Sequence, residues 1–353
     1  MSRIENLLER TVDAGASDLH LIADHPPLVR VHTVLGPLDG EPVLTAEETD
    51  AYARDLLSPE QQQRLQERRD CDFSASLRRG TRFRVNAHHQ RGSVALAFRV
   101  IPEKVPALES LNLPPVLVDF ANLPTGLVLV TGETGSGKST TLASIIDYMN
   151  QRYRYHVITL EDPIEYSLTS HLATIEQREV GIDVLDFSSG LRHALRQDPD
   201  VILIGEMRDL ETISTALTAA ETGHVVLSTL HTNDAAGTVE RIIDIFPAGQ
   251  QGQVRSMLAN TLRGVVCQRL FARIDEPGMV PACEVLVSTP AVRNCIRENR
   301  IFEIPQIIET NRALGMQLFD ESLKQLYFNG RISHDDALDN ARTPDQLARV
   351  LSA

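Results

Sequence analysis

Short apolar runs alternate with amphipathic stretches through the second half of the chain. Four of these runs are Leu127–Val130, His156–Leu160, Val201–Ile204 and His224–Thr229. Runs of this length, each followed by residues at helical spacing, predict strands that alternate with helices. This alternation is typical of a parallel sheet with helices on its faces, so we expect an α/β domain over residues 116–289.

The first hundred residues follow a different pattern. Apolar residues recur at helical spacing between positions 4 and 13, and Thr45 with Glu48 forms the capping box of a second helix. Apolar and polar residues then alternate, as in half-buried strands, in the segments Arg82–Ala87 and Val94–Val100. We therefore expect a separate α+β domain over residues 1–100.

Prolines separate these two predicted domains, and the end of the chain has a helical pattern. A linker is expected over residues 101–115, because this stretch contains Pro102, Pro106, Pro114 and Pro115. Residues 290–353 are expected to form a C-terminal helical region. Its predicted helices are Ala291–Glu298, Met316–Phe328 and Pro344–Leu351.

A glycine-rich loop lies between the first apolar run and a helical stretch, which is the context of a phosphate-binding loop. It matches G-x-x-x-x-G-K-[S/T] and comprises Gly132, Glu133, Thr134, Gly135, Ser136, Gly137, Lys138, Ser139 and Thr140. The glycines let backbone N–H groups turn toward phosphate oxygens. Lys138 would contact the β- and γ-phosphates, and Ser139 would hold Mg²⁺ through its hydroxyl. The alternative is a surface loop that matches the motif by chance, but such a loop would not need a strand before it and a helix after it. Because both are predicted here, we expect this protein to bind a nucleoside triphosphate.

Two groups of carboxylates follow apolar runs and are candidates for chemistry at the phosphates. Glu206 comes just after the run Val201–Ile204. In nucleotide-binding proteins an acidic residue at this place holds Mg²⁺ or its bound water, although the usual Asp is absent here. Glu161, Asp162 and Glu165 follow another run, and one of them is a candidate general base for the attacking water. The alternatives are a solvated glutamate at a strand end and a plain acidic loop.

Two histidines flank a single predicted strand. His224 and His231 bracket the run between them, and from there they could sense a γ-phosphate through hydrogen bonds. An ordinary core or surface position is the alternative for each. No third ligand with suitable spacing accompanies them, so we do not expect a metal site here.

Three arginines belong to strands of the predicted first domain. Arg82 and Arg84 alternate with apolar residues and therefore share one face, and Arg99 ends the neighbouring strand. Guanidinium groups on one sheet suit a clamp that acts on the phosphates of another subunit. From the residues alone, solvated strand charges are the better interpretation.

Composition narrows the classes of partner. The formal net charge of -14 argues against a nucleic-acid partner or an anionic lipid surface, because both need basic residues. The four cysteines form no C-x-x-C pair, so buried free thiols are expected rather than disulfides or zinc ligands. The sequence has no signal-peptide pattern and no uncharged run long enough to span a bilayer. We expect a cytoplasmic protein, or one that docks on a membrane through a partner.

Several motifs together resemble one family. They are GETGSGKSTT at 132–141, EDPIEY at 161–166, QREVGID at 177–183, LRQDPDVILIGEMRDLET at 195–212 and TALTAAETGHVVLSTLHT at 215–232. The match extends into the first domain through GASDLHL at 15–21 and RFRVNAHHQRG at 82–92. These segments resemble the ATPases of type II secretion and type IV pili, and nearly end to end the chain is most similar to the pilus retraction ATPases.

The resemblance implies a PAS-like N-terminal domain joined to a RecA-like ATPase domain, assembled as a hexameric ring that uses ATP and Mg²⁺. It implies that Glu165 is the general base and that Glu206 ends an atypical Walker B motif. It also implies that Arg82, Arg84 and Arg99 of one subunit complete the site of a neighbouring subunit. His224 and His231 would be the histidines of the family's His box. The implied partners are a platform protein of the inner membrane and, as a further candidate, a paralogous retraction ATPase. The implied location is the cytoplasmic face of the inner membrane at the pilus base.

Three features bear on the subfamily. This chain lacks the paired C-x-x-C motifs of assembly and type II secretion ATPases, and PAVRNCIRE at 290–298 is similar to the AIRNLIRE signature of retraction ATPases. Gly181 and Ile182, in contrast, are closer to the PilU-like accessory paralogue. The expected function is an ATP-driven motor for pilus retraction. The alternatives are a PilU-like accessory subunit and a related export ATPase, whereas the acidic balance disfavours a nucleic-acid translocase.

Overall fold

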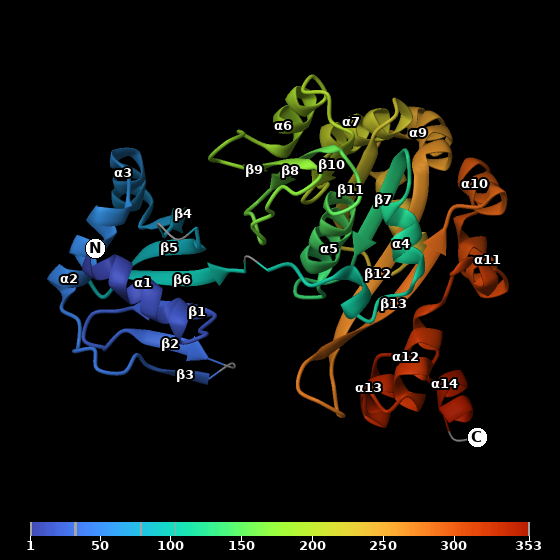
Figure 1. Ribbon diagram of the computed structural model, residues 1–353. Helices are drawn as coiled ribbons and strands as arrows, with labels where there is room; N and C mark the ends of the chain where they lie inside the picture. Colours follow the sequence, from blue (N-terminus) through green and yellow to red (C-terminus); the bar gives the residue numbers. More distant parts are fainter. Residues whose placement is uncertain (1, 32–33, 78–79, 103, 352–353) are drawn as a thin grey trace. The chain divides into compact units, whose positions relative to one another are not determined.

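The computed structural model describes residues 2–31, 34–77, 80–102 and 104–351. The chain divides into two compact units, each with its own sheet (Figure 1). The first unit comprises Met1–Lys104 together with Glu165–Ser167, and the second comprises Val105–Ile164 together with Leu168–Ala353. Because each unit has a hydrophobic core of its own, each is described separately.

The first unit is built on an antiparallel sheet with the strand order β3-β2-β1-β6-β5-β4. Its elements are α1 (Arg3–Asp13), β1 (Asp18–Leu21), β2 (Leu28–Val31), β3 (Val34–Pro37), α2 (Ala46–Leu56), α3 (Pro59–Arg68), β4 (Asp70–Ser76), β5 (Arg82–Gln90) and β6 (Ser93–Ile101). One face of the sheet packs against the helices. Phe83, Val85 and Phe98 are buried there with Leu7 of α1 and Tyr52 of α2.

Local sequence explains where these helices begin. Each of the three starts with a capping box. The hydroxyl of Ser2, Thr45 or Ser58 accepts the backbone N–H of the residue three positions later, and the glutamate or glutamine side chain of that later residue accepts the backbone N–H of the capping residue. Such reciprocal caps satisfy N–H groups that have no partner inside the helix. The capping box predicted at Thr45 and Glu48 is therefore confirmed.

The second unit is built on a seven-stranded sheet with the order β13-β12-β7-β11-β10-β8-β9. All neighbouring strands are parallel except β12 and β13, which form an antiparallel hairpin. The strands are β7 (Gly126–Thr131), β8 (His156–Glu161), β9 (Thr174–Glu179), β10 (Val201–Ile204), β11 (Val225–Leu230), β12 (Leu262–Ala272) and β13 (Met279–Val287). The four predicted parallel strands are present, whereas β9, β12 and β13 were not anticipated.

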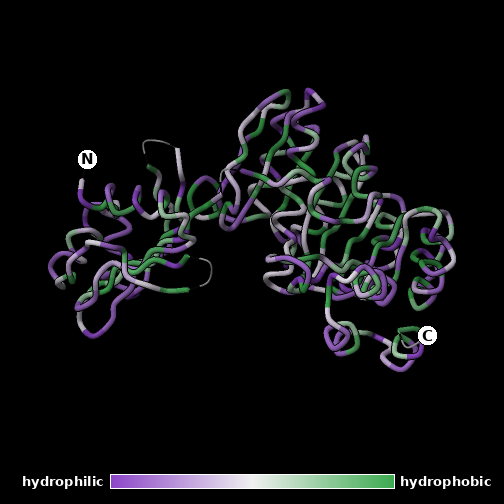
Figure 2. The backbone as a smooth tube through the Cα atoms, turned by 60° about the horizontal axis from the view of Figure 1, so that its bottom comes forward, coloured by the Kyte–Doolittle hydropathy of each residue, from purple (hydrophilic) through white to green (hydrophobic). Residues whose placement is uncertain are grey.

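Helices cover both faces of this sheet. They are α4 (Val116–Ala121), α5 (Lys138–Asn150), α6 (Phe187–Ala194), α7 (Leu210–Glu221), α8 (Ala235–Asp244) and α9 (Ala248–Thr261). One face packs against α7, α8 and α9, and the other packs against α4 and α5. Figure 2 shows the hydrophobic strands running through the interior of the unit. Since both faces are covered there, the central strands β7, β10 and β11 are buried throughout and mostly apolar, as parallel strands usually are.

The chain beyond β13 is helical, as expected. It forms α10 (Pro290–Arg297), α11 (Ile304–Thr310), α12 (Phe319–Phe328), α13 (His334–Asp339) and α14 (Pro344–Leu351). Helix α10 packs on α9, whereas α12 and α14 form a small core with Phe271 and Val280 at the far end of the β12–β13 hairpin. Among the described residues, no helix combines the length and apolar character that crossing a membrane requires.

Candidate functional site

The glycine-rich loop adopts the backbone that a phosphate cradle requires. It connects β7 to α5, and Gly132, Gly135 and Gly137 all have positive φ angles, of 141°, 81° and 88°. Side chains at such angles are strained, and a Cβ on Gly132 would lie 2.2 Å from the carbonyl oxygen of Gln268. Gly137 is also the N-cap residue of α5, so the free N–H groups of that helix face the loop.

Lys138 is buried at the start of α5 and turns back over the loop. Its ammonium nitrogen donates hydrogen bonds to the carbonyl oxygens of Gly132 at 2.8 Å and Glu133 at 2.9 Å. Burial lowers the pKa of Lys138, and the negative charge of Glu206 partly opposes this shift. The loop therefore concentrates a buried cation where phosphate oxygens would bind, while Ser139 is exposed beside it.

Gln268 is a residue of the site that the sequence pattern did not single out. It is buried on β12, donates a hydrogen bond from Nε2 to the carbonyl oxygen of Ser136 at 2.8 Å, and accepts one from the Thr141 hydroxyl at 2.8 Å. One side chain thus fixes both the loop and the first turn of α5. The available signal was a glutamine inside the apolar run of β12, because buried polar side chains need a structural or chemical reason.

Glu206 follows β10 at the same edge of the sheet. Its carboxylate contacts the guanidinium of Arg208 at 2.7 Å and His231 Nε2 at 3.4 Å. Burial alone would raise the pKa of Glu206, but the hydrogen bond from Arg208 and the nearby charges of His231 and Arg208 outweigh it and lower the pKa. Glu206 is therefore an ionised carboxylate. Arg208, which sequence reasoning missed, is its main partner.

The two histidines lie at opposite ends of β11. His231 follows the C-terminal end of the strand, beside the phosphate loop, because Leu230 pairs with Thr131. His224 precedes the strand, where its carbonyl accepts the N–H of Gly126 and its ring lies 2.9 Å from the Ala219 carbonyl oxygen. A six-residue strand spans about 20 Å, so both histidines cannot reach one phosphate. The role expected of His224 stays a prediction, and within one copy of the chain it would have to be exerted away from the phosphate loop.

The acidic segment after β8 begins at the edge of the sheet that carries the phosphate loop, here called the catalytic edge. Its residues from Glu165 to Ser167 group with the first unit. The carboxylate of Glu161 accepts hydrogen bonds from the Thr159 hydroxyl at 2.6 Å and the Gln177 amide at 3.0 Å. The charge of Asp162 reaches Arg208 and helps to raise the pKa of that guanidinium after the larger effect of Glu206. Glu165 is exposed and groups with the first unit. Its role as general base stays a prediction.

The structure brings the three arginines to one face of the first unit's sheet. Arg84 and Arg99 lie directly opposite each other on β5 and β6, and Arg82 lies two residues further along the same face of β5. Arg99 donates to the carboxylate of Asp18 at 2.9 Å. Burial would raise the pKa of Asp18, but hydrogen bonds from Ser17 and Arg99 lower it overall. This is the open face, opposite the buried Phe83.

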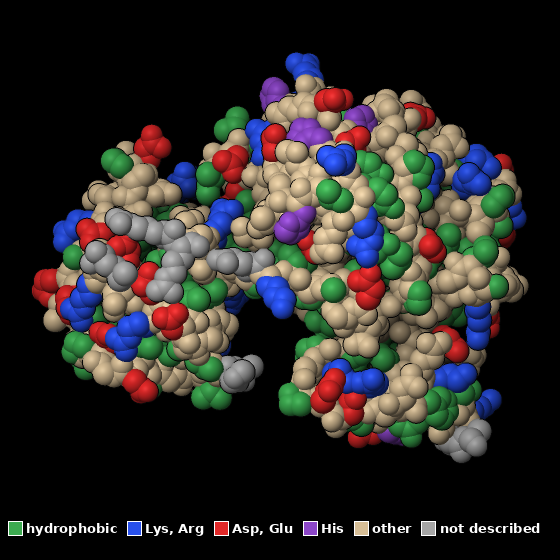
Figure 3. Space-filling view, viewed as in Figure 1, with side chains coloured by type: hydrophobic (Ala, Val, Ile, Leu, Met, Phe, Trp, Pro, Cys, Tyr) green, Lys and Arg blue, Asp and Glu red, His purple; other side chains and the backbone are tan. Residues whose placement is uncertain are grey.

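All four cysteines are free and buried, as the sequence predicted. Burial raises the pKa of Cys283 to about 12. On the surfaces turned to the viewer in Figure 3, acidic and basic side chains are interspersed over both units.

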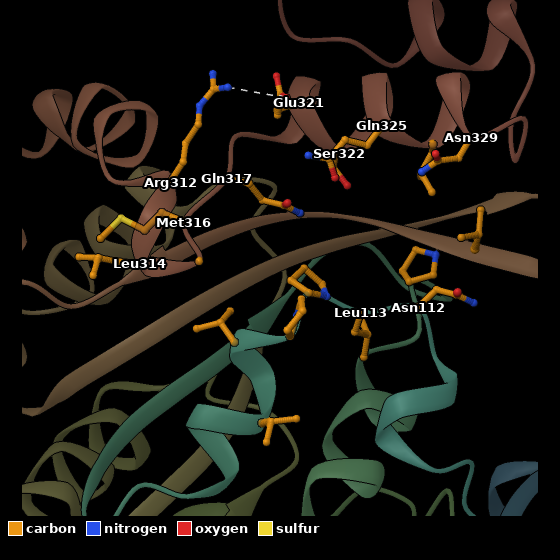
Figure 4. Close-up of a pocket in the computed structure, with 18 of the residues that line it drawn as sticks. Asn112, Leu113, Arg312, Leu314, Met316, Gln317, Glu321, Ser322, Gln325 and Asn329 are labelled. Carbon is orange, nitrogen blue, oxygen red and sulfur yellow. Dashed lines mark ion pairs between the residues drawn. The ribbon is translucent and has the colours of Figure 1, made fainter.

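A cavity of about 1310 Å³ lies elsewhere in the second unit (Figure 4). Its walls come from the segment before α4, from β13 and from α12, and Arg312 pairs with Glu321 at 3.7 Å along its rim. None of the predicted phosphate-site residues line this cavity. The phosphate loop and this cavity are therefore separate features of the same unit.

Comparison with known proteins shows similarity along nearly the whole chain. Over 344 residues it is 46% identical to the type IV pilus retraction ATPase PilT of Pseudomonas aeruginosa, which covers 98% of this chain and 99% of that protein. It is 40% identical to the type IV pilus ATPase PilU of the same organism, with coverage of 98% and 91%. A crystal structure of the pilus retraction motor PilT with bound ADP superposes with a TM-score of 0.92 at 44% identity, covering 99% of this chain and all of that one.

Residues 55–331 match the family described as type II/IV secretion system protein. This segment contains the phosphate loop, Glu206, His231 and the three arginines. The match therefore includes every site residue that the sequence predicted. The chain belongs to the type II/IV secretion system protein family.

Proposed function

We propose that this protein is an ATP-hydrolysing motor subunit that drives retraction of type IV pili, the movement behind twitching motility. The observation that carries the proposal is similarity to a PilT retraction ATPase over 98% of the chain. The buried Lys138 and the ionised Glu206 beside His231 would supply a site for a nucleotide in the same unit. The identity to PilT, at 46%, exceeds that to PilU, at 40%, and so favours the motor over the accessory subunit.

The residues of the loop suit ATP as substrate. Backbone N–H groups at the start of α5 would hold the phosphates, and Lys138 would exchange its two carbonyl partners for phosphate oxygens. Mg²⁺ would be held by the Ser139 hydroxyl and the Glu206 carboxylate, oxygen donors of the kind it prefers. When bound, it would neutralise charge on the phosphates.

The remaining roles concern the attacking water and the charge that develops during transfer. Glu165 is proposed as the general base, with Glu161 as the alternative, because each carries a carboxylate close in sequence to β8. His231 would orient the Glu206 carboxylate toward the phosphates, because its Nε2 lies 3.4 Å from that carboxylate. Arg82, Arg84 and Arg99 would stabilise the phosphates bound by a neighbouring subunit.

Because the arginines of one subunit would act on the nucleotide of another, the proposed site requires an assembly. We propose a homohexameric ring. The ring would act in the cytoplasm at the inner-membrane face of the pilus base, on a membrane platform protein, with a paralogous retraction ATPase as a further partner. ATP binding at a subunit boundary would draw one subunit's first unit toward its neighbour's second unit, and hydrolysis would release it. No nucleic acid is required by this scheme.

The proposal is tested by a Lys138→Ala variant beside a Lys324→Ala control. Lys324 is a surface lysine on α12 that pairs with Glu321 at 3.7 Å. We expect Lys138→Ala to lose ATP turnover, because the ammonium that would contact the phosphates is gone. Its melting temperature should stay near that of the wild type, because the loss of two hydrogen bonds to the loop is offset by removal of a buried cation. The Lys324→Ala protein should retain turnover.

Steady ATP hydrolysis by Lys138→Ala would overturn the assignment of the site. A second measurement separates motor from accessory. If Lys138→Ala lacks turnover yet restores twitching to a strain that lacks this gene, the subunit assists another motor and does not drive retraction itself.

A further inference from the structure

A buried carboxylate that the phosphate site does not use lies two strands away from the phosphate loop. Glu284 on β13 has only 2% of its surface exposed. It pairs across the sheet with Cys267 of β12, which pairs in turn with Thr131, the last residue of β7 before the loop. The row continues to Leu230, which precedes His231. Glu284 therefore lies level with the catalytic edge of the sheet.

The two oxygens of this carboxylate hold residues 233–235, one directly and the other through Arg342. One oxygen accepts the backbone N–H of Ala235, the first residue of α8, at 2.8 Å. The other oxygen pairs with the guanidinium of Arg342, which comes from the connection between α13 and α14. Arg342 also donates to the carbonyl oxygen of Asn233 at 2.6 Å. The pair thus holds residues 233–235 from two sides.

His231 lies two residues before the segment that is held in this way. Further along, the hydroxyls of Thr232 and Thr238 are hydrogen-bonded at 2.7 Å, and Asp234 caps α8. The His231 ring reaches Glu206 at 3.4 Å, and its side chain is 42% exposed. Because the ring is only partly packed against the protein, its position depends on the backbone that carries it. Just after His231, that backbone is bonded to Arg342 and Glu284.

Arg342 is itself fixed by the C-terminal helices. Its backbone N–H donates to the carboxylate of Asp320 in the first turn of α12 at 2.7 Å, and its guanidinium lies 5.6 Å from the centre of the Phe319 ring. Burial raises the pKa of Glu284, and the charge of Arg342 opposes that shift. Loss of Arg342 would leave a buried carboxylate without its cation, a state that proteins relieve by protonation or by moving the segment.

We propose that Glu284 and Arg342 are positioning residues for ATP hydrolysis, holding the 231–235 segment so that His231 stays against Glu206. The C-terminal helices α12–α14 thereby belong to the catalytic arrangement, although none of their side chains lies at the phosphate loop. This inference rests on the proposed ATPase function. A purely structural pair would stabilise the unit without affecting hydrolysis in particular.

The test uses the full-length protein with Arg342→Ala, Arg342→Lys and Glu284→Gln. The matched control is Arg331→Ala, because the Arg331 side chain is 37% exposed, as is that of Arg342, but pairs with the surface Asp275 at 2.7 Å. Two quantities are measured: the kcat and KM for ATP, and amide hydrogen exchange in peptides covering residues 231–238 and 132–140. The exchange measurement does not depend on turnover.

We expect Arg342→Ala to lower kcat about tenfold with KM changed less than twofold, since small displacements of positioned groups cost this much or more. Exchange should quicken in residues 231–238 and stay unchanged in residues 132–140. Arg342→Lys keeps a cation beside Glu284 and should recover part of kcat, whereas Arg331→Ala should match the wild type. If Arg342→Ala does not fold, Arg342→Lys and Glu284→Gln are compared in the same way, each with a smaller fall in kcat.

Three results would overturn the inference: an unchanged kcat in the Arg342 variants, exchange that rises equally in both peptides, or an equal loss in Arg331→Ala. Failure of the proposed function is a different result. In that case the wild-type protein itself hydrolyses no ATP.

Discussion

At the scale of single residues, the phosphate loop depends on a side chain from a distant strand. Gln268 donates to Ser136, a residue 132 positions earlier, and the absent Cβ atoms of Gly132 and Gly137 leave room for its approach. The glycines therefore serve two purposes. They free the backbone N–H groups for phosphate, and they let β12 support the loop from behind.

Replacing Gln268 by leucine should raise the KM for ATP roughly tenfold, because an unsatisfied buried hydrogen-bonding group costs about 1–3 kcal/mol and here that cost displaces the loop. Turnover at saturating ATP should change less than KM. The control is Arg269→Ala, the next residue on β12, whose side chain is exposed. The measurement is the rate of ATP turnover of both variants as a function of ATP concentration. An unchanged KM in Gln268→Leu would show that the loop keeps its shape without Gln268.

At the scale of elements, helix α10 has one apolar and one charged face, as the helical spacing of its apolar residues and arginines predicts. Val292, Cys295 and Ile296 are buried, whereas Arg297 is exposed and Arg293 is half-buried. The positive charge of Arg293 reaches Arg263, whose pKa is lowered by burial first and by this neighbour second. Removing Arg293 thus relieves a repulsion between like charges and should not weaken the packing of α10 on α9.

The double variant Arg293→Ala with Arg297→Ala should keep its oligomeric state and most of its ATPase activity but lose pilus retraction. The reason is that its apolar face is untouched while the two charges are removed from its outer side. Twitching of cells carrying the variant is the measurement. Arg300→Ala serves as the control, since that arginine follows the helix and pairs with Glu303 at 3.1 Å. Normal twitching in the double variant would mean that α10 is only structural.

At the scale of the whole molecule, the candidate chemistry is divided between two units with separate cores. The arginines lie on the open face of the first unit's sheet, and the phosphate loop lies in the second unit. A site shared between neighbouring copies of the chain would use both surfaces. It would also couple nucleotide state to the movement of one copy against another.

Mixing Arg99→Ala protein with Lys138→Ala protein should therefore restore activity that neither variant has alone. In an equal mixture, about one quarter of the boundaries in a closed ring would combine an intact arginine face with an intact loop. The mixture should then reach up to about that fraction of wild-type turnover. Mixed assemblies must first be confirmed by mass. If they form and remain inactive, the arginines serve their own chain or only the fold.

The sequence by itself determined the phosphate loop, the four central parallel strands, the capping box at Thr45 and the face of α10 that is buried. These features depend on residues close together in the chain: a glycine pattern, a run of apolar residues, or a helical repeat. It also placed Arg82 and Arg84 on one face, because side chains alternate along a strand. Comparable local signals were absent from β9, where charged and polar residues predominate.

Only the tertiary structure decided which distant residues meet. The strand order sets Gln268 behind the loop and His231 against Glu206, and the packing of the C-terminal helices sets Arg342 against Glu284. It also removes His224 to the opposite edge of the sheet, because the two ends of one strand face opposite edges. These contacts join residues from separate elements, and their geometry follows from strand pairing and helix packing. No repeat within a short window of sequence encodes such pairings, so the fold itself has to be seen before they can be assigned.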